Sequence, residues 1–351
     1  MMNLENDYKN LHKIPEIGFL EFKTHEYIFN RLKELNCTIY KIETSLIAYF
    51  DYQKDETIAF RAELDGLNIT ENNDFEYKSI HPGFMHACGH DGHMSILLSL
   101  CDYLNLNTCS KNVCCIFQTS EEKYGGALQI INSKILQKLD VKEIYALHLW
   151  PGLKEGSVCS RNGVLLASST EIDIHIYGKS SHIANRSEGI NAIMVANLLL
   201  EKIKENDEII FNCGRITSDG SRNSICSHVL LECSLRSFSV TKRYYFLKLL
   251  EDECKNLSSE TNTKIIIDID KTTQSVSNDY SLFNKNKKYL NCVIEPFFQA
   301  EDFSEYSKVC KTLYFLVGIG DCNKLHSDNF SFNIDNLKIG YDLFLNIINN
   351  D

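Results

Sequence analysis

Four short apolar runs stand out along the chain, and each leads to ionisable side chains. Runs of this length are typical of buried strands. In open α/β sheets the functional groups lie at the carboxyl ends of the strands, so four such runs predict one shared site. The runs and the groups at their ends are Thr57–Phe60 with Asp65, Val113–Phe117 with Glu121 and Glu122, Glu143–Leu147 with His148, and Leu313–Val317 with His326.

The middle of the chain has a different pattern. Polar and apolar residues alternate over Glu171–Tyr177, as expected of a strand with one exposed face. The elements predicted from here on follow the order strand, helix, strand, strand, helix, strand, which is that of a ferredoxin-like unit. They are a helix over Gly189–Lys204, strands over Glu208–Cys213 and His228–Arg236, a helix over Lys242–Leu257 and a strand over Lys264–Ile269.

These patterns predict an α/β protein in which one domain interrupts another. The larger domain has a central mixed sheet flanked by helices and comprises residues 1–167 and 272–351. An inserted ferredoxin-like α+β domain comprises residues 168–271. A helix over Thr24–Leu35 belongs to the larger domain, because its apolar residues recur near helical spacing.

Composition narrows the classes of function. The net charge of −11 argues against a nucleic-acid partner, and no apolar run approaches the ~20 residues that span a bilayer. The first residues lack a cationic segment followed by an apolar one, which favours a cytoplasmic location. Most of the 14 cysteines are then expected to be reduced, with Cys114, Cys115 and Cys233 acting as small core residues.

Two polar clusters carry candidate chemistry. The segment His86–His93 contains Cys88 and His90, and the apolar pattern after it predicts a helix that begins near His90. Thiol, imidazole and carboxylate groups bind divalent metals, although a histidine-rich loop without metal has the same composition. The pair Glu121-Glu122 follows a buried strand, which weakens the alternative that both are solvated surface residues.

These motifs resemble, in order along nearly the whole chain, the metal-dependent amidohydrolase family. That family includes hippurate hydrolase, N-acyl-amino-acid amidohydrolases, N-acetyldiaminopimelate deacetylase and plant auxin-conjugate hydrolases. The matching segments are His12–Phe19, Arg61–Leu67, Met85–Asp91, Phe117-Gln118 with Glu121-Glu122, His148–Pro151, Gly178–His182, Glu301–Ser304 and Leu325–Ser327.

The resemblance implies a site with two divalent metal ions (Zn²⁺, Mn²⁺, Co²⁺ or Ni²⁺). Glu121 is then the general base, and Asp65 is similar to the family's catalytic aspartate, which orients a site residue. The chemistry is consistent, because a metal can polarise an amide carbonyl and activate water while a carboxylate moves the proton. The implied metal ligands are Cys88, His90, Glu122, His148 and His326.

Three further residues acquire roles only through the resemblance. His182 matches an oxyanion stabiliser that often reaches the partner's site in a dimer, which implies a homodimer formed through the inserted lid or dimerisation domain. Asn223 and Arg236 match positions that contact substrate, and Arg236 would pair with a substrate carboxylate. The alternatives are a histidine on a surface loop and an arginine on an exposed strand face.

The sequence therefore predicts a hydrolase that cleaves the amide bond of small N-acyl amino acids of the acetyl or benzoyl type. N-acetyldiaminopimelate is one specific substrate to consider, and a dipeptidase is the nearest enzymatic alternative. A second class is an inactive homologue that still binds metal or ligand. The intact Glu121 beside a complete ligand set argues against that class.

Overall fold

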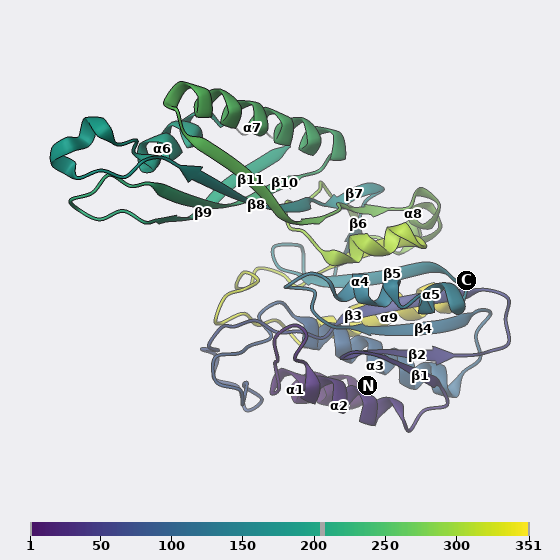
Figure 1. Cartoon of the computed structure of the whole chain (residues 1–351). Coiled ribbons are helices and arrows are strands. Elements are labelled where there is room, and N and C mark those ends of the chain that lie inside the picture. The colour runs from purple at the N-terminus through teal and green to yellow at the C-terminus, as the bar shows by residue number, and fades with distance from the viewer. Residues whose placement is uncertain (1, 204–207, 350–351) are drawn as a thin grey trace. The chain divides into compact units, whose positions relative to one another are not determined.

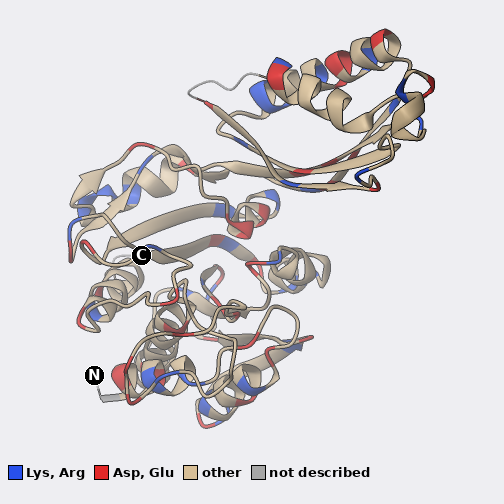
Figure 2. Cartoon of the chain, turned by 90° about the vertical axis from the view of Figure 1, so that its left-hand side faces the viewer, with Lys and Arg blue, Asp and Glu red and all other residues tan. Residues whose placement is uncertain are grey.

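The computed structural model describes residues 2–203 and 208–349, which form two compact units. Unit 1 comprises Met1–Leu165, Ser277–Glu295 and Glu301–Asp351, and unit 2 comprises Leu166–Val276 and Pro296–Ala300. Figure 2 shows that basic and acidic residues are interspersed over both units. Within the described residues, no helix combines the length and apolar character needed to cross a membrane.

Unit 1 is built on an eight-stranded mixed sheet with the order β1-β2-β4-β3-β5-β14-β6-β13 (Figure 1). Its centre, β4-β3-β5-β14, is parallel throughout, whereas β2 joins β4 antiparallel. The mixed sheet is therefore confirmed. The strands are β1 (Thr38–Ile42), β2 (Ser45–Phe50), β3 (Thr57–Glu63), β4 (Asn112–Gln118), β5 (Val141–Trp150), β6 (Val158–Ser160), β13 (Cys292–Val293) and β14 (Lys311–Gly318), and β7 (Gly163–Leu166) pairs with β12 (Val276–Asn278).

Helices flank this sheet, and buried apolar side chains of α1, α2, α3 and α9 share one core with the central strands. The predicted helix near residue 24 is observed, but it begins at Phe22 and ends at Leu32. The helix expected at His90 does begin there. The helical elements are α1 (Met2–His12), α2 (Phe22–Leu32), α3 (His90–Leu106), α4 (Gly126–Asn132), α5 (Ile135–Lys138), α8 (Tyr280–Asn286), η2 (Lys287–Tyr289), η3 (Asp302–Lys308) and α9 (Asn336–Asn349).

Unit 2 is a four-stranded antiparallel sheet, β11-β8-β10-β9, with the predicted element order β8-α6-β9-β10-α7-β11. Asn191 caps α6 by accepting a hydrogen bond from the Ile193 amide at 3.0 Å, so this helix starts later than predicted. Lys204, its predicted last residue, lies outside the described residues. The elements are β8 (Ser168–Tyr177), η1 (Ile183–Glu188), α6 (Ala192–Lys202), β9 (Ile209–Ser218), β10 (His228–Ser237), α7 (Val240–Thr261) and β11 (Lys264–Thr273).

The cysteines follow the expectation with one exception. Cys159 and Cys292 form a disulfide between β6 and β13, and the other twelve are free thiols. Cys114, Cys115 and Cys233 are buried, as predicted for small core residues.

Candidate metal centre

The topology of unit 1 explains why residues far apart in sequence meet. Strands β4, β3, β5 and β14 are neighbours and parallel, so their carboxyl ends lie at one edge of the sheet. Glu122 follows β4, Asp65 follows β3, His148 lies near the end of β5, and His326 lies in the loop after β14. Cys88 and His90 reach the same edge from the start of α3, where Gly89 adopts a positive φ of 85° that suits glycine.

The structure brings the five predicted ligands together. The Cys88 Sγ atom lies 3.4 Å from His148 Nε2, and Glu122 Oε1 lies 3.1 Å from His326 Nε2. Ligand atoms of Cys88, His90 and His148 lie within 4.8 Å of one another, as do those of Cys88, Glu122 and His326. Cys88 therefore belongs to both groups, and the five side chains form one continuous cluster.

The orientation of His90 leaves one ring nitrogen for a ligand. His90 Nδ1 lies 2.8 Å from the carbonyl oxygen of Asp65, and a carbonyl only accepts, so Nδ1 carries the hydrogen. The other nitrogen, Nε2, is buried and has no hydrogen-bond partner among the described residues. A lone pair held in this way is typical of a histidine that binds metal through Nε2.

The charges around the cluster also suit a cation. Burial disfavours a charged His90, but the nearby carboxylates of Asp65, Glu63 and Glu122 outweigh it and raise its pKa to about 10. Burial also opposes ionisation of Glu122, yet His326 and His90 lower its pKa to about 2. The protein thus favours positive charge at this position, and a divalent ion can supply it in place of a proton. A set of sulfur, nitrogen and oxygen donors fits Zn²⁺, Mn²⁺, Co²⁺ or Ni²⁺.

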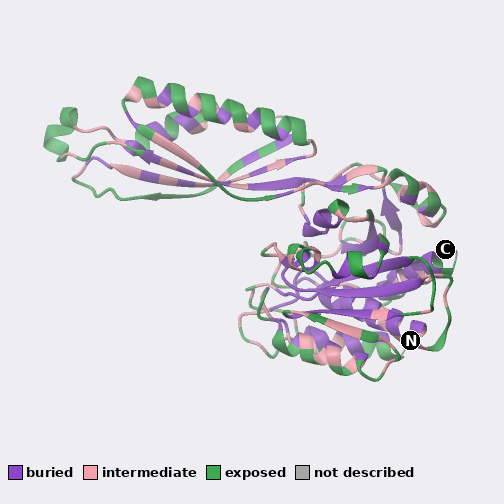
Figure 3. Cartoon of the chain, turned by 45° about the vertical axis from the view of Figure 1, so that its right-hand side comes forward, coloured by how far each residue is buried: buried purple, intermediate pink, exposed green. Residues whose placement is uncertain are grey.

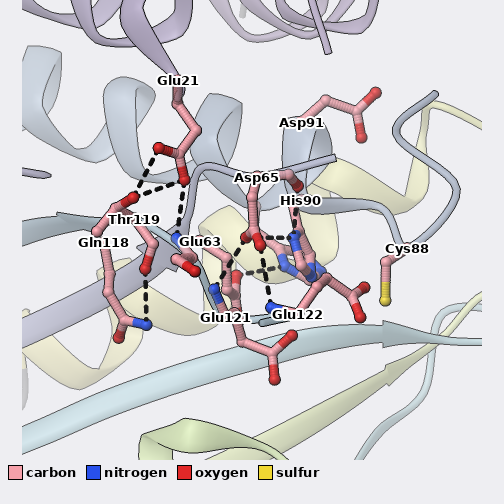
Figure 4. A network of polar contacts seen from close by, with 12 residues as sticks. Glu21, Glu63, Asp65, Cys88, His90, Asp91, Gln118, Thr119, Glu121 and Glu122 are labelled. Carbon is pink, nitrogen blue, oxygen red and sulfur yellow. Dashed lines mark hydrogen bonds and ion pairs between the residues drawn. The ribbon is translucent and has the colours of Figure 1, made fainter. Parts of the chain in front are cut away.

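Asp65 fixes the turn that carries Glu121 and Glu122. Its two carboxylate oxygens accept hydrogen bonds from the amides of Glu121 at 3.1 Å and Glu122 at 3.0 Å. Figure 4 shows Asp65 between this turn and His90. Asp65 therefore holds both glutamates through its carboxylate and orients His90 through its backbone carbonyl.

Glu121 has a different environment from its neighbour Glu122. Burial raises the pKa of Glu121 well above its usual range, and the nearby carboxylates of Glu301, Glu122 and Asp302 raise it further. A carboxyl group whose pKa is shifted toward neutral pH can both accept and return a proton. The two neighbouring glutamates therefore differ in proton affinity, which is low for Glu122 and high for Glu121.

A buried network beside the site was missed from the sequence. Arg61 is fully buried and ion-pairs with Glu63, with Glu301 at 2.9 Å and with Asp302 at 2.7 Å. His93 Nδ1 lies 2.7 Å from Glu63 Oε2. The signal that could have revealed it is the presence of Arg61 and Glu63 inside an otherwise apolar strand, because buried charges require partners.

The remaining predicted residues belong to unit 2. His182 is exposed and its Nδ1 accepts a hydrogen bond from the Ala184 amide at 3.2 Å. The Ile183 amide donates to the carbonyl of Asn223, so His182 and Asn223 lie on adjoining segments. Arg236 is on β10 and is half-buried, and its Nη1 is buried without a hydrogen-bond partner among the described residues. An unpaired guanidinium nitrogen is a suitable partner for an anionic ligand. The functional roles of His182, Asn223 and Arg236 stay predictions.

Fold and site together define a two-unit α/β protein with a metal-type cluster at the edge of a parallel sheet. Residues 59–350 match the peptidase family M20/M25/M40, and the chain belongs to this family.

Individual relatives agree with this assignment. The chain is 31% identical over 344 residues to the N-acetyldiaminopimelate deacetylase of Shouchella clausii, covering 93% of this chain and 92% of the relative. It is 33% identical over 261 residues to the Bacillus velezensis enzyme of the same name, covering 71% and 70%. Among solved structures, the YXEP protein of Bacillus subtilis, described as a dinuclear metal-binding peptidase of family M20, superposes with a TM-score of 0.87 at 24% identity and 98% and 95% coverage.

Proposed function

We propose that this protein hydrolyses the amide bond of small N-acyl amino acids and releases a carboxylate and the free amino acid. One observation carries the proposal: Cys88, His90, Glu122, His148 and His326 converge at one sheet edge, with Glu121 beside them. The similarity to N-acetyldiaminopimelate deacetylases over nearly the whole chain supports an acylated amino acid as the substrate.

The five clustered residues would hold two divalent metal ions, as the description of the YXEP protein suggests. Bound metal supplies a Lewis acid for the amide carbonyl and lowers the pKa of water. Glu121 takes the proton from the attacking water and passes it to the leaving nitrogen, for which its raised pKa suits it. Asp65 keeps Glu121 in place through the backbone of the turn.

The residues of unit 2 are assigned to the substrate. Arg236 pairs with the substrate carboxylate, Asn223 contacts the substrate, and His182 stabilises the developing oxyanion, in line with the family resemblance. We further propose that unit 2 serves as a lid or dimerisation domain and that the protein is a homodimer. Twelve free thiols support a reducing compartment such as the cytoplasm.

Among N-acyl amino acids, N-acetyldiaminopimelate is the substrate that the named relatives favour. A panel of N-acetyl and N-benzoyl amino acids, N-acetyldiaminopimelate and dipeptides, assayed with and without a chelator, tests both the reaction and the preference. We expect release of free amino acid that the chelator abolishes and added metal restores. Turnover of dipeptides alone would indicate a peptidase, and full metal occupancy without any turnover would indicate a binding protein.

Mixing two inactive variants tests whether the site is shared. If His182 acts across subunits, a mixture of the Glu121→Gln and His182→Ala proteins regains turnover once their subunits have exchanged. The hybrid dimer then contains one site with an intact Glu121 and the partner's intact histidine. An active monomer in sedimentation experiments would contradict the shared site.

A further inference from the structure

Glu21 is a buried carboxylate with uncharged partners. It precedes α2 at the N-cap position, but its side chain forms no hydrogen bond to its own helix. The side chain is 0% exposed, and a carboxylate is buried only where hydrogen bonds replace its water. Its partners therefore indicate what the residue is for.

Hydrogen bonds link the Glu21 carboxylate to the strand ends near the metal centre. It accepts from the hydroxyl of Thr119 at 2.6 Å, from the hydroxyl of Thr44 at 2.8 Å and from the amide of Ser120 at 2.8 Å. The two hydroxyl groups also lie 2.8 Å apart, so they connect to each other as well as to Glu21. Figure 4 shows Glu21 beside Thr119 at the end of β4, and Asp65 farther along the same turn, beside Glu121 and Glu122.

Two carboxylates thus share three successive backbone amides. The Ser120 amide donates to Glu21, and the next two amides, those of Glu121 and Glu122, donate to Asp65. Ser120 has a positive φ of 49°, a conformation that is uncommon for residues other than glycine and persists only where surrounding contacts enforce it. The Glu21 hydrogen bond lies at this residue, immediately before the two site glutamates.

We propose that Glu21 is a positioning residue that, together with Asp65, clamps the turn presenting Glu121 and Glu122 to the metal centre. This inference rests on the proposed function for its link to catalysis. The clamp acts through hydrogen-bond acceptors, so an amide oxygen in the same position can replace the carboxylate. Burial raises the pKa of Glu21, which is consistent with a neutral side chain being tolerated there.

The test compares Glu21→Ala with the near-isosteric Glu21→Gln. A glutamine keeps an oxygen for the Ser120 amide and the Thr119 hydroxyl, and its NH₂ group faces Thr44, whose hydroxyl hydrogen can turn to Thr119. Alanine leaves these donors unpaired. If Glu21→Ala does not fold, Glu21→Asp takes its place, because its shorter side chain cannot reach the same donors.

A matched control separates this role from a general loss of stability. Asn278 is also buried in unit 1; its side chain accepts from the Tyr314 amide at 2.7 Å and donates to Ser160 Oγ at 3.0 Å. Asn278→Ala therefore removes a comparable set of buried hydrogen bonds without touching the turn. Thermal unfolding shows whether the variants are destabilised to a similar extent.

The measurements are kcat and KM for the best substrate of the panel, and Zn²⁺ affinity by competition with a chromophoric chelator. We expect Glu21→Ala to lose about 10- to 100-fold in kcat and in Zn²⁺ affinity with little change in KM, as found for residues that orient ligands. Glu21→Gln should retain most of both, and Asn278→Ala should match the wild type.

Two results would overturn the clamp: Glu21→Ala (or Asp) matching Asn278→Ala in kcat and Zn²⁺ affinity, or Glu21→Gln losing as much as Glu21→Ala. If the wild-type protein cleaves nothing in the panel, the proposed function fails, and the Zn²⁺ affinities alone still decide the clamp.

Discussion

The sheets of the two units differ in how much of each strand is buried. Every residue of β3 and β4 in unit 1 is buried, whereas β8 and β10 in unit 2 alternate between buried and partly exposed positions (Figure 3). A charged group in unit 1 must therefore be paired or bind a cation, while one on the open face of unit 2 can remain hydrated. Replacing a charged side chain should consequently have a large effect on activity or stability in unit 1 and a small effect in unit 2.

The largest expected difference is in kcat, between a substitution of Glu121 in unit 1 and one of Glu171 in unit 2. Replacing Glu121 by glutamine should lower kcat by about 10²- to 10⁴-fold, because general base catalysis is lost, and should leave metal binding intact. Glu171, which is half-exposed on β8, is the matched control, and Glu171→Gln should retain normal kcat. Steady-state kinetics and metal analysis on both variants check this. Near-normal turnover by Glu121→Gln would exclude it as the base.

The second prediction removes the cation from the buried network. Arg61→Met leaves Glu63, Glu301 and Asp302 without their guanidinium partner, and we expect the free energy of unfolding to fall by about 3–5 kcal/mol. Burial raises the pKa of Asp302 to about 8 even beside Arg61, so an ionised Asp302 is already disfavoured before its cationic partner is removed.

Urea unfolding followed by fluorescence of Trp150, the single tryptophan, reports on unit 1. Arg61→Lys serves as the control that keeps the charge and loses the planar geometry. If Arg61→Met lowers the free energy of unfolding by less than about 1 kcal/mol, the three carboxyl groups do not need a cation to remain buried.

The third prediction is a pH dependence confined to unit 1. Burial disfavours a charged His12, but the hydrogen bonds that its ring donates to the carboxylates of Asp91 at 2.6 Å and Glu71 at 3.0 Å outweigh it and raise its pKa to about 9. The unfolded chain has a histidine pKa of about 6.5. His12 thus contributes stability that is fully present below about pH 6.5 and is lost as the pH rises through about 9.

His12→Gln should remove this dependence. We expect the wild-type free energy of unfolding, measured through Trp150, to decline between about pH 6.5 and 9, and the variant to show a flatter profile over the same range. Equal slopes for both proteins would mean that His12 is not charged in the folded state.

The contrast between the units also explains what could be predicted from the sequence. Apolar runs revealed the four central strands and alternation revealed β8, because both patterns are local. The runs placed Glu122, His148 and His326 near strand ends, whereas the full set of candidate ligands, with Cys88 and His90 before α3, came only from the family resemblance. The pairing of Arg61 with Glu301, and of His12 with Asp91, joins distant segments and leaves no local spacing to detect. Helices α1 and α9 were missed although they cover the core, and Glu21 was missed because its partners are set by tertiary structure.

The smallest expected effect lies on the sheet of unit 2. Arg215 on β9 and Glu232 on β10 form an ion pair at 3.2 Å, with side chains 72% and 38% exposed. Solvent and salt screen such pairs, so Arg215→Gln should lower stability by about 0.2–1 kcal/mol, and less at high salt. Hydrogen exchange of the β10 amides measures this locally. A loss comparable to that of Arg61→Met would show that unit 2 depends on its charges as unit 1 does, and the contrast between the two sheets would no longer hold.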